Sequence, residues 1–375
     1  MSAPLPPPAG ALRIPVYQPD LSGNERRYVL ECLDSTWISS KGRFIAEFEA
    51  AFAAHVGAAH AVSVCNGTAA LHLALHALGI GAGDEVLVPT LTYIASVNAI
   101  RHVGATPVFV DACADTWQID AAAARRALTP RTRALLAVHL YEGACAMPPL
   151  RALCDQAGLL LVEDCAEAIG TRYRGAHVGN AGAIGTFSFF GNKTITTGEG
   201  GMLVCNDAAL AEDLRRLRGQ GLVPGREYWH DRVGYNYRMT NICAAIGLAQ
   251  IERIAAIVAA KKTLAQRYRD ALAGSAFSFQ QFDADTDPGH WMVSVLAPTA
   301  QACTAVRAAL AAAGVETRPL FVPAHRLPMY ELPAGSFPVA EDLAARGINL
   351  PSWHSLGSEQ IAAITAIMRS TLEHT

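Results

Sequence analysis

One lysine, Lys193, stands alone among small and hydroxylated residues in the stretch FSFFGNKTITTGEGG, residues 187–201. Apolar runs at 187–190 and 202–205 predict a buried strand on each side, so Lys193 is expected on a turn between two apolar segments. Partial burial lowers the pKa of an amine and makes it a usable nucleophile, which is what a Schiff-base lysine needs. The alternative is an ordinary surface lysine at the tip of a hairpin.

A second group that could bind a ligand is Asn66-Gly67-Thr68, which follows the apolar segment AVSV and opens the helical pattern AALHLALHAL. Free backbone N–H groups and the dipole at a helix N-terminus attract an anion such as a phosphate. Gly67 lets the backbone approach closely, and the Thr68 hydroxyl adds a donor. Ser188, in the strand before the lysine turn, could supply another hydroxyl to the same phosphate. The alternative is an ordinary helix cap, since asparagine and threonine are common there.

Asp164 ends the most apolar segment of the chain, LLLVED at residues 159–164. A carboxylate at the end of a buried strand is costly unless a cation or a strong donor pairs with it. A protonated pyridine nitrogen is such a partner; a helix cap or a salt bridge to an arginine is the alternative. Lys193 lies 29 residues further on, so both side chains are expected to reach one planar ring. Tyr93 would either stack on that ring or fill the core with a solvated hydroxyl.

These side chains need a scaffold, and a pattern of strand, loop and helix repeats from about residue 61 to 218. The expected strands are residues 61–64, 85–89, 106–111, 134–141, 159–164, 186–190 and 201–205. Helical patterns separate the earlier strands at residues 69–78, 121–128 and 149–157. The alternation predicts an α/β fold with a mainly parallel, seven-stranded sheet covered by helices on both faces. Because ligands bind at the carboxyl ends of such strands, Thr68, Asp164 and Lys193 are expected at one rim.

The sequence on either side of this region predicts further elements. Phe44, Phe48 and Phe52 recur every four residues, which indicates the buried face of a helix. A polar, aromatic loop at 219–241 and a helix at 242–273 lead to a second α/β pattern from about residue 290. We therefore expect three parts: a disordered, proline-rich leader at 1–12, a large domain at 13–250 and a smaller C-terminal domain at 251–375.

Composition narrows the class of protein. Of the 375 residues, 51% are hydrophobic and 17% are charged, which is typical of a well-buried globular enzyme. A net charge of −3 argues against nucleic acid as a partner. No uninterrupted apolar run is long enough to span a bilayer, and the start MSAPLPPPAG lacks the regions of a signal peptide. The nine cysteines show no metal-site spacing, so we expect a cytoplasmic protein with reduced cysteines, no metal and no membrane contact.

Several longer segments together resemble the DegT/DnrJ/EryC1/StrS family of sugar aminotransferases. The resemblance runs nearly end to end, and it is carried by WISSKG (37–42), NGTAALHLAL (66–75), VPTLTYIASVNAI (88–100), VHLY (138–141), VEDCAEAIG (162–170), FSFFGNKTITTGEGGM (187–202), GYNYRMTNICAAIGLAQIE (234–252) and HRLPMY (325–330). It implies the PLP-dependent transferase fold type I, similar to aspartate aminotransferase, with pyridoxal 5'-phosphate as cofactor. FSFFGNKTITTGEGG and the glutamate in EDCAEAIG are most similar to members that aminate C4 of a GDP-linked sugar.

The resemblance also implies a role for individual residues around the cofactor. Lys193 would bond to it and then shuttle protons, and Asp164 would pair with its pyridine nitrogen. Glu167 would lie near the ring hydroxyl, where many relatives have glutamine. Tyr93 would stack on the ring. The phosphate would be held by Gly67, Thr68 and Ser188.

Further residues are implied at the subunit boundary and around the substrate. The family forms homodimers with shared active sites, in which Asn236 would reach the phosphate of the partner subunit. His325 and Tyr330 would contact the nucleotide-sugar. Trp37 and Ser39 are also expected at the substrate, although from their sequence context they could equally be surface turn residues.

The reaction that the resemblance implies is transamination. L-glutamate would supply the amino group, and C4 of a nucleotide-linked 4-keto-6-deoxyhexose, above all GDP-4-keto-6-deoxymannose, would receive it. The alternatives are a dTDP- or UDP-linked sugar, a 3-keto sugar, or a non-catalytic regulatory protein; Lys193 argues against the dehydratase branch, in which histidine replaces lysine. Many relatives read G-Q-x-x-D-M-D-P after VHLY, whereas residues 142–149 read EGACAMPP. Glu142 and Ala146 are therefore expected to change a loop near the cofactor edge.

Overall fold

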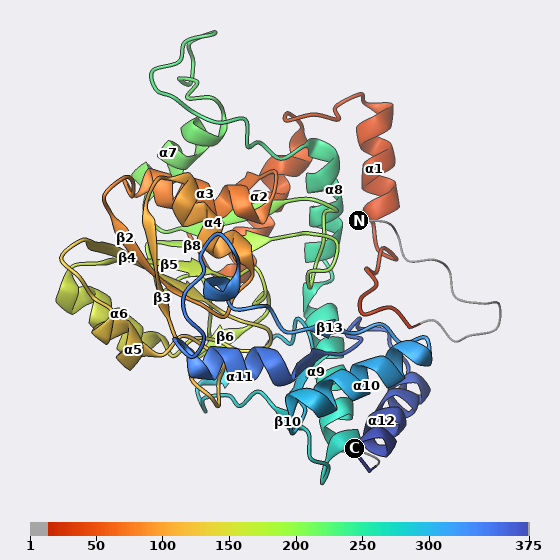
Figure 1. The fold of residues 1–375 in the computed structure, drawn as a ribbon. Coiled ribbons are helices and arrows are strands. Elements are labelled where there is room, and N and C mark those ends of the chain that lie inside the picture. Colours follow the sequence, from red (N-terminus) through yellow and green to blue (C-terminus); the bar gives the residue numbers. More distant parts are fainter. Residues whose placement is uncertain (1–13, 374–375) are drawn as a thin grey trace.

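The computed structural model describes residues 14–373, and its central feature is a seven-stranded sheet with helices on both faces (Figure 1). The predicted leader at 1–12 lies outside the described residues. The C-terminal helices and a smaller sheet gather beside and below the central sheet in Figure 1. The predicted α/β architecture is therefore confirmed.

All seven predicted strands are present in the central sheet. They are β1 (His60–Val64), β2 (Glu85–Pro89), β3 (Thr106–Val110), β4 (Thr132–Val138), β5 (Leu160–Asp164), β8 (Ile184–Ser188) and β9 (Gly201–Cys205). The spatial order is β1-β9-β8-β5-β4-β2-β3. Only β9 runs against its neighbours, so the carboxyl ends of the other six strands meet at one rim.

Helices bury their apolar sides on both faces of this sheet. One face packs against α3 (Gly67–Ala77), α4 (Ile94–His102) and α7 (Ala208–Arg218). The other packs against α2 (Arg43–Val56), α5 (Ala121–Arg126), α6 (Met147–Ala157) and α8 (Asn241–Ile251). Phe44, Phe48 and Phe52 of α2 are fully buried, as predicted, and Phe52 packs edge-on against Phe187 of β8. Each such ring contributes about 2–3 kcal/mol through burial.

The remaining elements lie around this core. They are α1 (Glu25–Asp34), β6 (Arg172–Tyr173), β7 (Ala176–His177), α9 (Ile254–Leu272), β10 (Ser278–Phe279), β11 (Thr286–Asp287), β12 (Ser294–Leu296), α10 (Ala300–Ala312), β13 (Arg318–Pro319), the 3₁₀ turn η1 (Ala324–Arg326), α11 (Pro338–Arg346), β14 (Gly347–Asn349) and α12 (Ser358–Glu373). Strands β10, β12, β14 and β13 form a four-stranded sheet, and β11 joins β6 and β7. The division at residue 250 stays a prediction.

The prediction of a single helix at 242–273 was wrong, because the chain bends by 63° between α8 and α9. Neither glycine nor proline causes the break. Tertiary contacts fix it instead: Tyr28 donates to Glu252 at 2.6 Å, and Arg253 pairs with Asp20 at 2.7 Å. Within residues 14–373, no single helix is long and apolar enough to cross a membrane, and only this bent pair passes that test when its two helices are combined.

Two predicted strands are shorter than expected. The strand expected at 134–141 ends at Val138, since Tyr141 adopts a left-handed backbone with φ of 59°. In the second α/β pattern, which was expected from about residue 290, the strand begins only at Ser294, and His290 before it has φ of 52°.

Candidate active site

A cavity of about 540 Å³ opens at the rim where the strand ends meet. Its walls come from the N-terminus of α3, the ends of β5 and β8, the start of α4 and two residues of the C-terminal part. Seven residues singled out from the sequence line it, namely Gly67, Thr68, Tyr93, Asp164, Glu167, Ser188 and Lys193. The structure therefore brings together side chains that are up to 126 positions apart, Gly67 and Lys193 being the extremes.

Lys193 lies in the turn between β8 and β9, as predicted, and both strands are buried along their full length. Only 11% of its side chain is exposed, and Nζ lies 3.8 Å from Oε1 of Glu167. Burial lowers the pKa of Lys193, while the charges of Glu167 and Asp164 oppose that shift. An amine whose pKa is lowered is deprotonated more often than an ordinary lysine, and is therefore the better nucleophile.

Asp164 is the last residue of β5 and is buried. Its Oδ2 accepts a hydrogen bond from Ser96 Oγ at 2.7 Å, and its Oδ1 accepts from the Ala166 amide at 3.1 Å. Burial raises the pKa of Asp164, and these two donors oppose the shift. Across residues 14–373 no lysine, arginine or histidine forms a salt bridge with this carboxylate. It can therefore accept one more strong donor from within the cavity.

Glu167 lies beside the lysine on the segment that follows β5. Its Oε2 accepts from the Tyr141 amide at 2.9 Å, and burial raises its pKa to about 7. The left-handed backbone of Tyr141 directs that amide toward the carboxylate. Near neutral pH this side chain is thus divided between its charged and neutral forms, so it can accept a hydrogen bond or donate one.

The N-terminus of α3 forms an anion cradle at one end of the cavity. Asn66 caps the helix by accepting the Ala69 amide at 2.8 Å, which leaves the amides of Gly67 and Thr68 without an acceptor in the described part of the chain. A Cβ on Gly67 would lie 2.8 Å from Cβ of Ser188, so only glycine lets the helix approach the end of β8 this closely. Two free amides and two hydroxyls therefore converge on one small volume, as a phosphate requires.

Two aromatic residues of the C-terminal part close the cavity from outside. The Phe321 ring lies 5.5 Å from that of Tyr93, which is 57% exposed at the start of α4. Trp291 places its ring centroid 4.0 Å from Lys193 Nζ. Sequence reasoning missed Trp291 and Phe321, because Trp291 lies in a segment that reads as an ordinary apolar strand and Phe321 directly follows another such segment.

Three other predicted residues do not line the cavity of their own chain. Trp37 and Ser39 lie in the exposed loop between α1 and α2, where their carbonyl groups accept hydrogen bonds from Asn241. Asn236 is exposed on the segment before α8, and its Oδ1 accepts from Arg238. Any contact of these residues with a ligand must therefore involve a second chain or a rearrangement.

His325 and Tyr330 also lie outside the cavity. His325 is fully buried; its Nδ1 lies 2.7 Å from the Thr90 hydroxyl and its Nε2 lies 3.0 Å from Glu341. Both ring nitrogens therefore have a partner within the chain, and the contact of His325 with a substrate stays a prediction. Tyr330 donates to Asn98 at 2.9 Å. His325 thus fastens η1 to the residue that follows β2, and Tyr330 fastens the loop after η1 to α4.

The expectation that Glu142 changes a loop near the cofactor edge stays a prediction, and the structure shows where this side chain lies. Glu142 is completely buried and lies behind the cavity wall, outside the lining. Its Oε2 lies 2.6 Å from His290 Nδ1 and 3.4 Å from Arg269, and its Oε1 accepts the Ser294 amide at 2.9 Å. This carboxylate therefore ties the end of β4 to α9 and to the segment that carries Trp291.

Two further residues that the sequence did not reveal support the reactive side chains. Ser96 holds Asp164, as described above, and Tyr17 donates its hydroxyl to the backbone oxygen of Lys193. Tyr17 belongs to an N-terminal segment that is itself fixed by contacts of Ile14 and Val16 with the C-terminal part. The signal for Ser96 was its place one helical turn after Tyr93; nothing in the sequence pointed to Tyr17.

A buried acid lies on the opposite side of β5 from Asp164. Glu163 accepts from the amides of Gly179, Ala181 and Gly182, and it lies 3.0 Å from Nε2 of His139. His139, Glu163 and Cys165 have ligand atoms within 4.8 Å of one another. Because the carboxylate is already saturated by these donors, we interpret the cluster as a brace for the strand ends.

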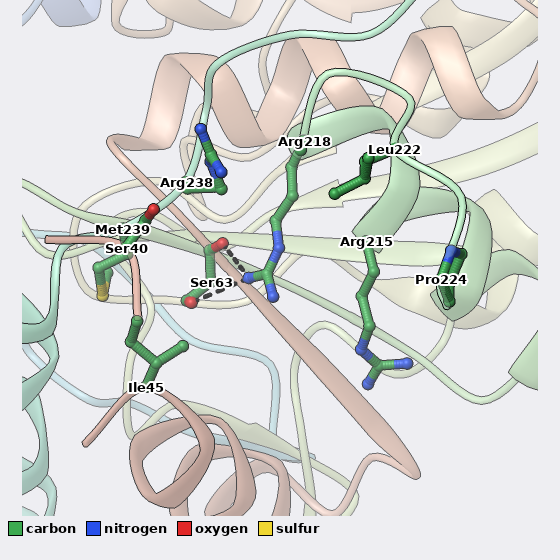
Figure 2. Close-up of a pocket in the computed structure, with 10 residues that line it drawn as sticks. Ser40, Ile45, Ser63, Arg215, Arg218, Leu222, Pro224, Arg238 and Met239 are labelled. Carbon is green, nitrogen blue, oxygen red and sulfur yellow. Dashed lines mark hydrogen bonds between the residues drawn. The ribbon is translucent and has the colours of Figure 1, made fainter. Parts of the chain in front are cut away.

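Figure 2 shows a second, smaller pocket of about 230 Å³ near the end of α7. Arg215, Arg218 and Arg238 point into it, and Arg218 donates to Ser63 and pairs with Glu49 at 2.6 Å. Within the part of the chain that the structure describes, no carboxylate, thiol or amine lines this pocket. The side chains that could carry out covalent chemistry therefore lie in the larger cavity.

Comparisons with known proteins identify the family of this chain. A sequence model of the DegT/DnrJ/EryC1/StrS aminotransferase family matches residues 19–369. The chain is 52% identical to the GDP-perosamine synthase of Escherichia coli O157:H7 over 351 residues, which cover 94% of this chain and 96% of that protein. It is 48% identical to the GDP-perosamine synthase of Vibrio cholerae over 355 residues, with 94% and 97% covered.

Solved structures show the same likeness. DesV of S. venezuelae superposes on this chain with a TM-score of 0.89 and 38% sequence identity, covering 94% of this chain and 95% of that one. The agreement extends over both the central sheet and the C-terminal elements, which confirms the predicted fold type I.

Proposed function

Because the chain belongs to the DegT/DnrJ/EryC1/StrS aminotransferase family, we propose that it transfers the amino group of L-glutamate to C4 of GDP-4-keto-6-deoxymannose, which yields GDP-perosamine. The chain is a sugar aminotransferase, and its cofactor is pyridoxal 5'-phosphate. The observation that carries the choice of sugar nucleotide is the identity of 48–52% to two GDP-perosamine synthases over 94% of the chain.

The groups that line the cavity fit a phosphorylated pyridine ring. The free amides of Gly67 and Thr68, with the hydroxyls of Thr68 and Ser188, would hold the phosphate. The unpaired carboxylate of Asp164 would accept the protonated ring nitrogen, which offsets the cost of burying the charge. Glu167 would face the ring hydroxyl, and Tyr93 would cover the ring.

Bound pyridoxal phosphate supplies an electron sink for the carbon that loses a proton. Among residues 14–373, Lys193 is the only amine that lines the cavity, so we assign to its Nζ the proton transfers to and from that carbon. The carboxyl of Glu167, 3.8 Å from Lys193 Nζ, would favour the protonated form of this amine when the carboxyl is charged. Ser96 and the Ala166 amide would hold Asp164 in place while its carboxylate pairs with the ring nitrogen.

The assignment includes a homodimer with shared active sites. Large apolar side chains are exposed together on α1 and the loop after it, at Leu30, Leu33, Trp37 and Ile38. A second copy covering this surface would bury them and would bring Trp37, Ser39 and Asn236 within reach of the other cavity. All nine cysteines are free, which supports a reducing, cytoplasmic location.

A product assay tests this function. The pure protein is incubated with pyridoxal phosphate, L-glutamate and either GDP-4-keto-6-deoxymannose or dTDP-4-keto-6-deoxyglucose, and the mass of the sugar nucleotide is measured. We expect amination of the GDP sugar and little of the dTDP sugar. Amination of the dTDP sugar alone would overturn the substrate while keeping the reaction. If neither sugar reacts, the proposed substrate is wrong.

A further inference from the structure

Trp291 is the only residue of the described chain whose aromatic ring faces the nitrogen of Lys193. The ring centroid lies 4.0 Å from Nζ, within the range at which an indole attracts an ammonium ion. The indole Nε1 donates to the backbone oxygen of Asn192 at 2.7 Å. Trp291 thus contacts the lysine turn twice, once at the backbone and once at the reactive atom.

The surroundings of Trp291 fix this position. Its ring lies parallel to that of Tyr141, with an angle of 6° and a centroid distance of 6.4 Å. His290, which precedes Trp291 in the chain, is held by Glu142, and the amide of Ser294, which follows it, donates to the same carboxylate. Trp291 is 4% exposed. The indole is therefore buried and held in place by a hydrogen bond and by ring packing.

The other groups that face Lys193 are acids. They are Glu167, at 3.8 Å, and Asp164, whose charge acts on the lysine from the end of β5. Glu167 is part-protonated near neutral pH, because burial raises its pKa to about 7. In the proposed function Asp164 pairs with the protonated ring nitrogen of the cofactor, so its charge attracts Lys193 less. Among these three neighbours, only the indole face would attract an ammonium ion at every pH and with the cofactor bound.

We propose that Trp291 is a further functional residue of the reaction, because its indole face holds the Lys193 nitrogen as an ammonium ion when the lysine has taken a proton from the substrate. The inference rests on the proposed function, which gives Lys193 this task. Its distinct claim is that the negative face of the ring, beyond its shape, stabilises the protonated lysine.

Fluorinated tryptophans introduced at position 291 test this claim directly. Fluorine weakens the negative face of the indole while leaving its shape and its N–H donor nearly intact. The readout is the pH dependence of reductive methylation of Lys193 in the apoenzyme, followed by mass spectrometry. We expect the pKa of Lys193 to fall progressively with the number of fluorine atoms, and by about 0.5–1 in total. An unchanged pKa across the series would overturn the proposal.

Three comparisons complete the experiment. The pKa of Lys193 should fall less in Trp291→Phe than in Trp291→Leu, because phenylalanine keeps an aromatic face. A merely structural role of Trp291 would instead predict losses of stability or activity without any change in the lysine pKa. The same fluorinated residues at the buried Trp353, in a separate cluster, should leave Lys193 unchanged. Because the measurement uses no sugar, a pKa that responds while GDP-4-keto-6-deoxymannose fails to react would refute the proposed substrate and sustain the role of Trp291.

Discussion

The inner floor of the cavity and its outer wall are built in different ways. On the floor, Thr68, Asp164 and Lys193 each follow a strand or open a helix, so the topology of the sheet alone brings them together. On the wall, Trp291 and Phe321 depend on hydrogen bonds to partners 99 and 180 residues away. The comparison predicts that damage to the floor abolishes chemistry in a folded protein, whereas damage to the groups that hold the wall in place, such as Glu142, first costs stability.

The largest effect should come from the floor. Replacing Lys193 with alanine removes the one amine that the described residues place in the cavity, so kcat should fall by about 10³-fold or more. Rates of product formation measure the loss, and circular dichroism checks that the variant folds. The matched control is Lys262→Ala. Lys262 lies on α9 and pairs with Asp287 of β11, so this variant should keep its activity. An active Lys193→Ala enzyme would remove the distinction between floor and wall.

The next effect should come from behind the wall. Glu142→Gln removes a buried charge on which His290 and Arg269 depend, so the free energy of unfolding should fall by about 3 kcal/mol. Urea denaturation of the apoenzyme measures this change. The exposed Glu359→Gln on α12 is the control and should change stability little. Equal stability of the two variants would show that this carboxylate does not fasten the C-terminal part.

A pH-dependent effect should distinguish Glu167 from its neighbours. The pKa of this carboxyl is raised from 4.5 to about 7 in the folded chain, so its protonation stabilises the fold most below pH 4.5. This stabilisation is lost as pH rises through about 7. Between pH 5.5 and 8 the wild-type apoenzyme should therefore lose about 2 kcal/mol relative to Glu167→Gln. Parallel stability curves for the two proteins would contradict the raised pKa.

The smallest effect should come from the N-terminal segment. Tyr17→Phe removes one buried hydroxyl that donates to the Lys193 carbonyl, which should lower the free energy of unfolding by about 1 kcal/mol. Because the lysine turn is also held by the Trp291 indole N–H, kcat should change far less than in Lys193→Ala. The control is Tyr228→Phe, at a residue that is 93% exposed. A loss of activity as large as that of Lys193→Ala would show that this segment belongs to the floor.

The same difference explains what the sequence could reveal. Hydrophobic patterns located the seven strands, the α2 phenylalanines and the lysine turn, because each of these depends on residues that are neighbours in the chain. They did not reveal the bend at Glu252–Arg253, which Asp20 and Tyr28 impose from more than 220 residues away. The burial of His325 could not be predicted for a related reason, since its partners Thr90 and Glu341 lie far from it or outside its own motif in the sequence.

The most direct test of the central claim is to identify the lysine that bonds to the cofactor. The chain has four lysines, and Lys261 is also buried, with its pKa lowered to about 7 by burial. Reduction of the enzyme with borohydride in the presence of pyridoxal phosphate, followed by digestion and mass spectrometry, would mark the bonded residue. Our account predicts the label on Lys193 alone. A label on Lys261, or on neither, would contradict it.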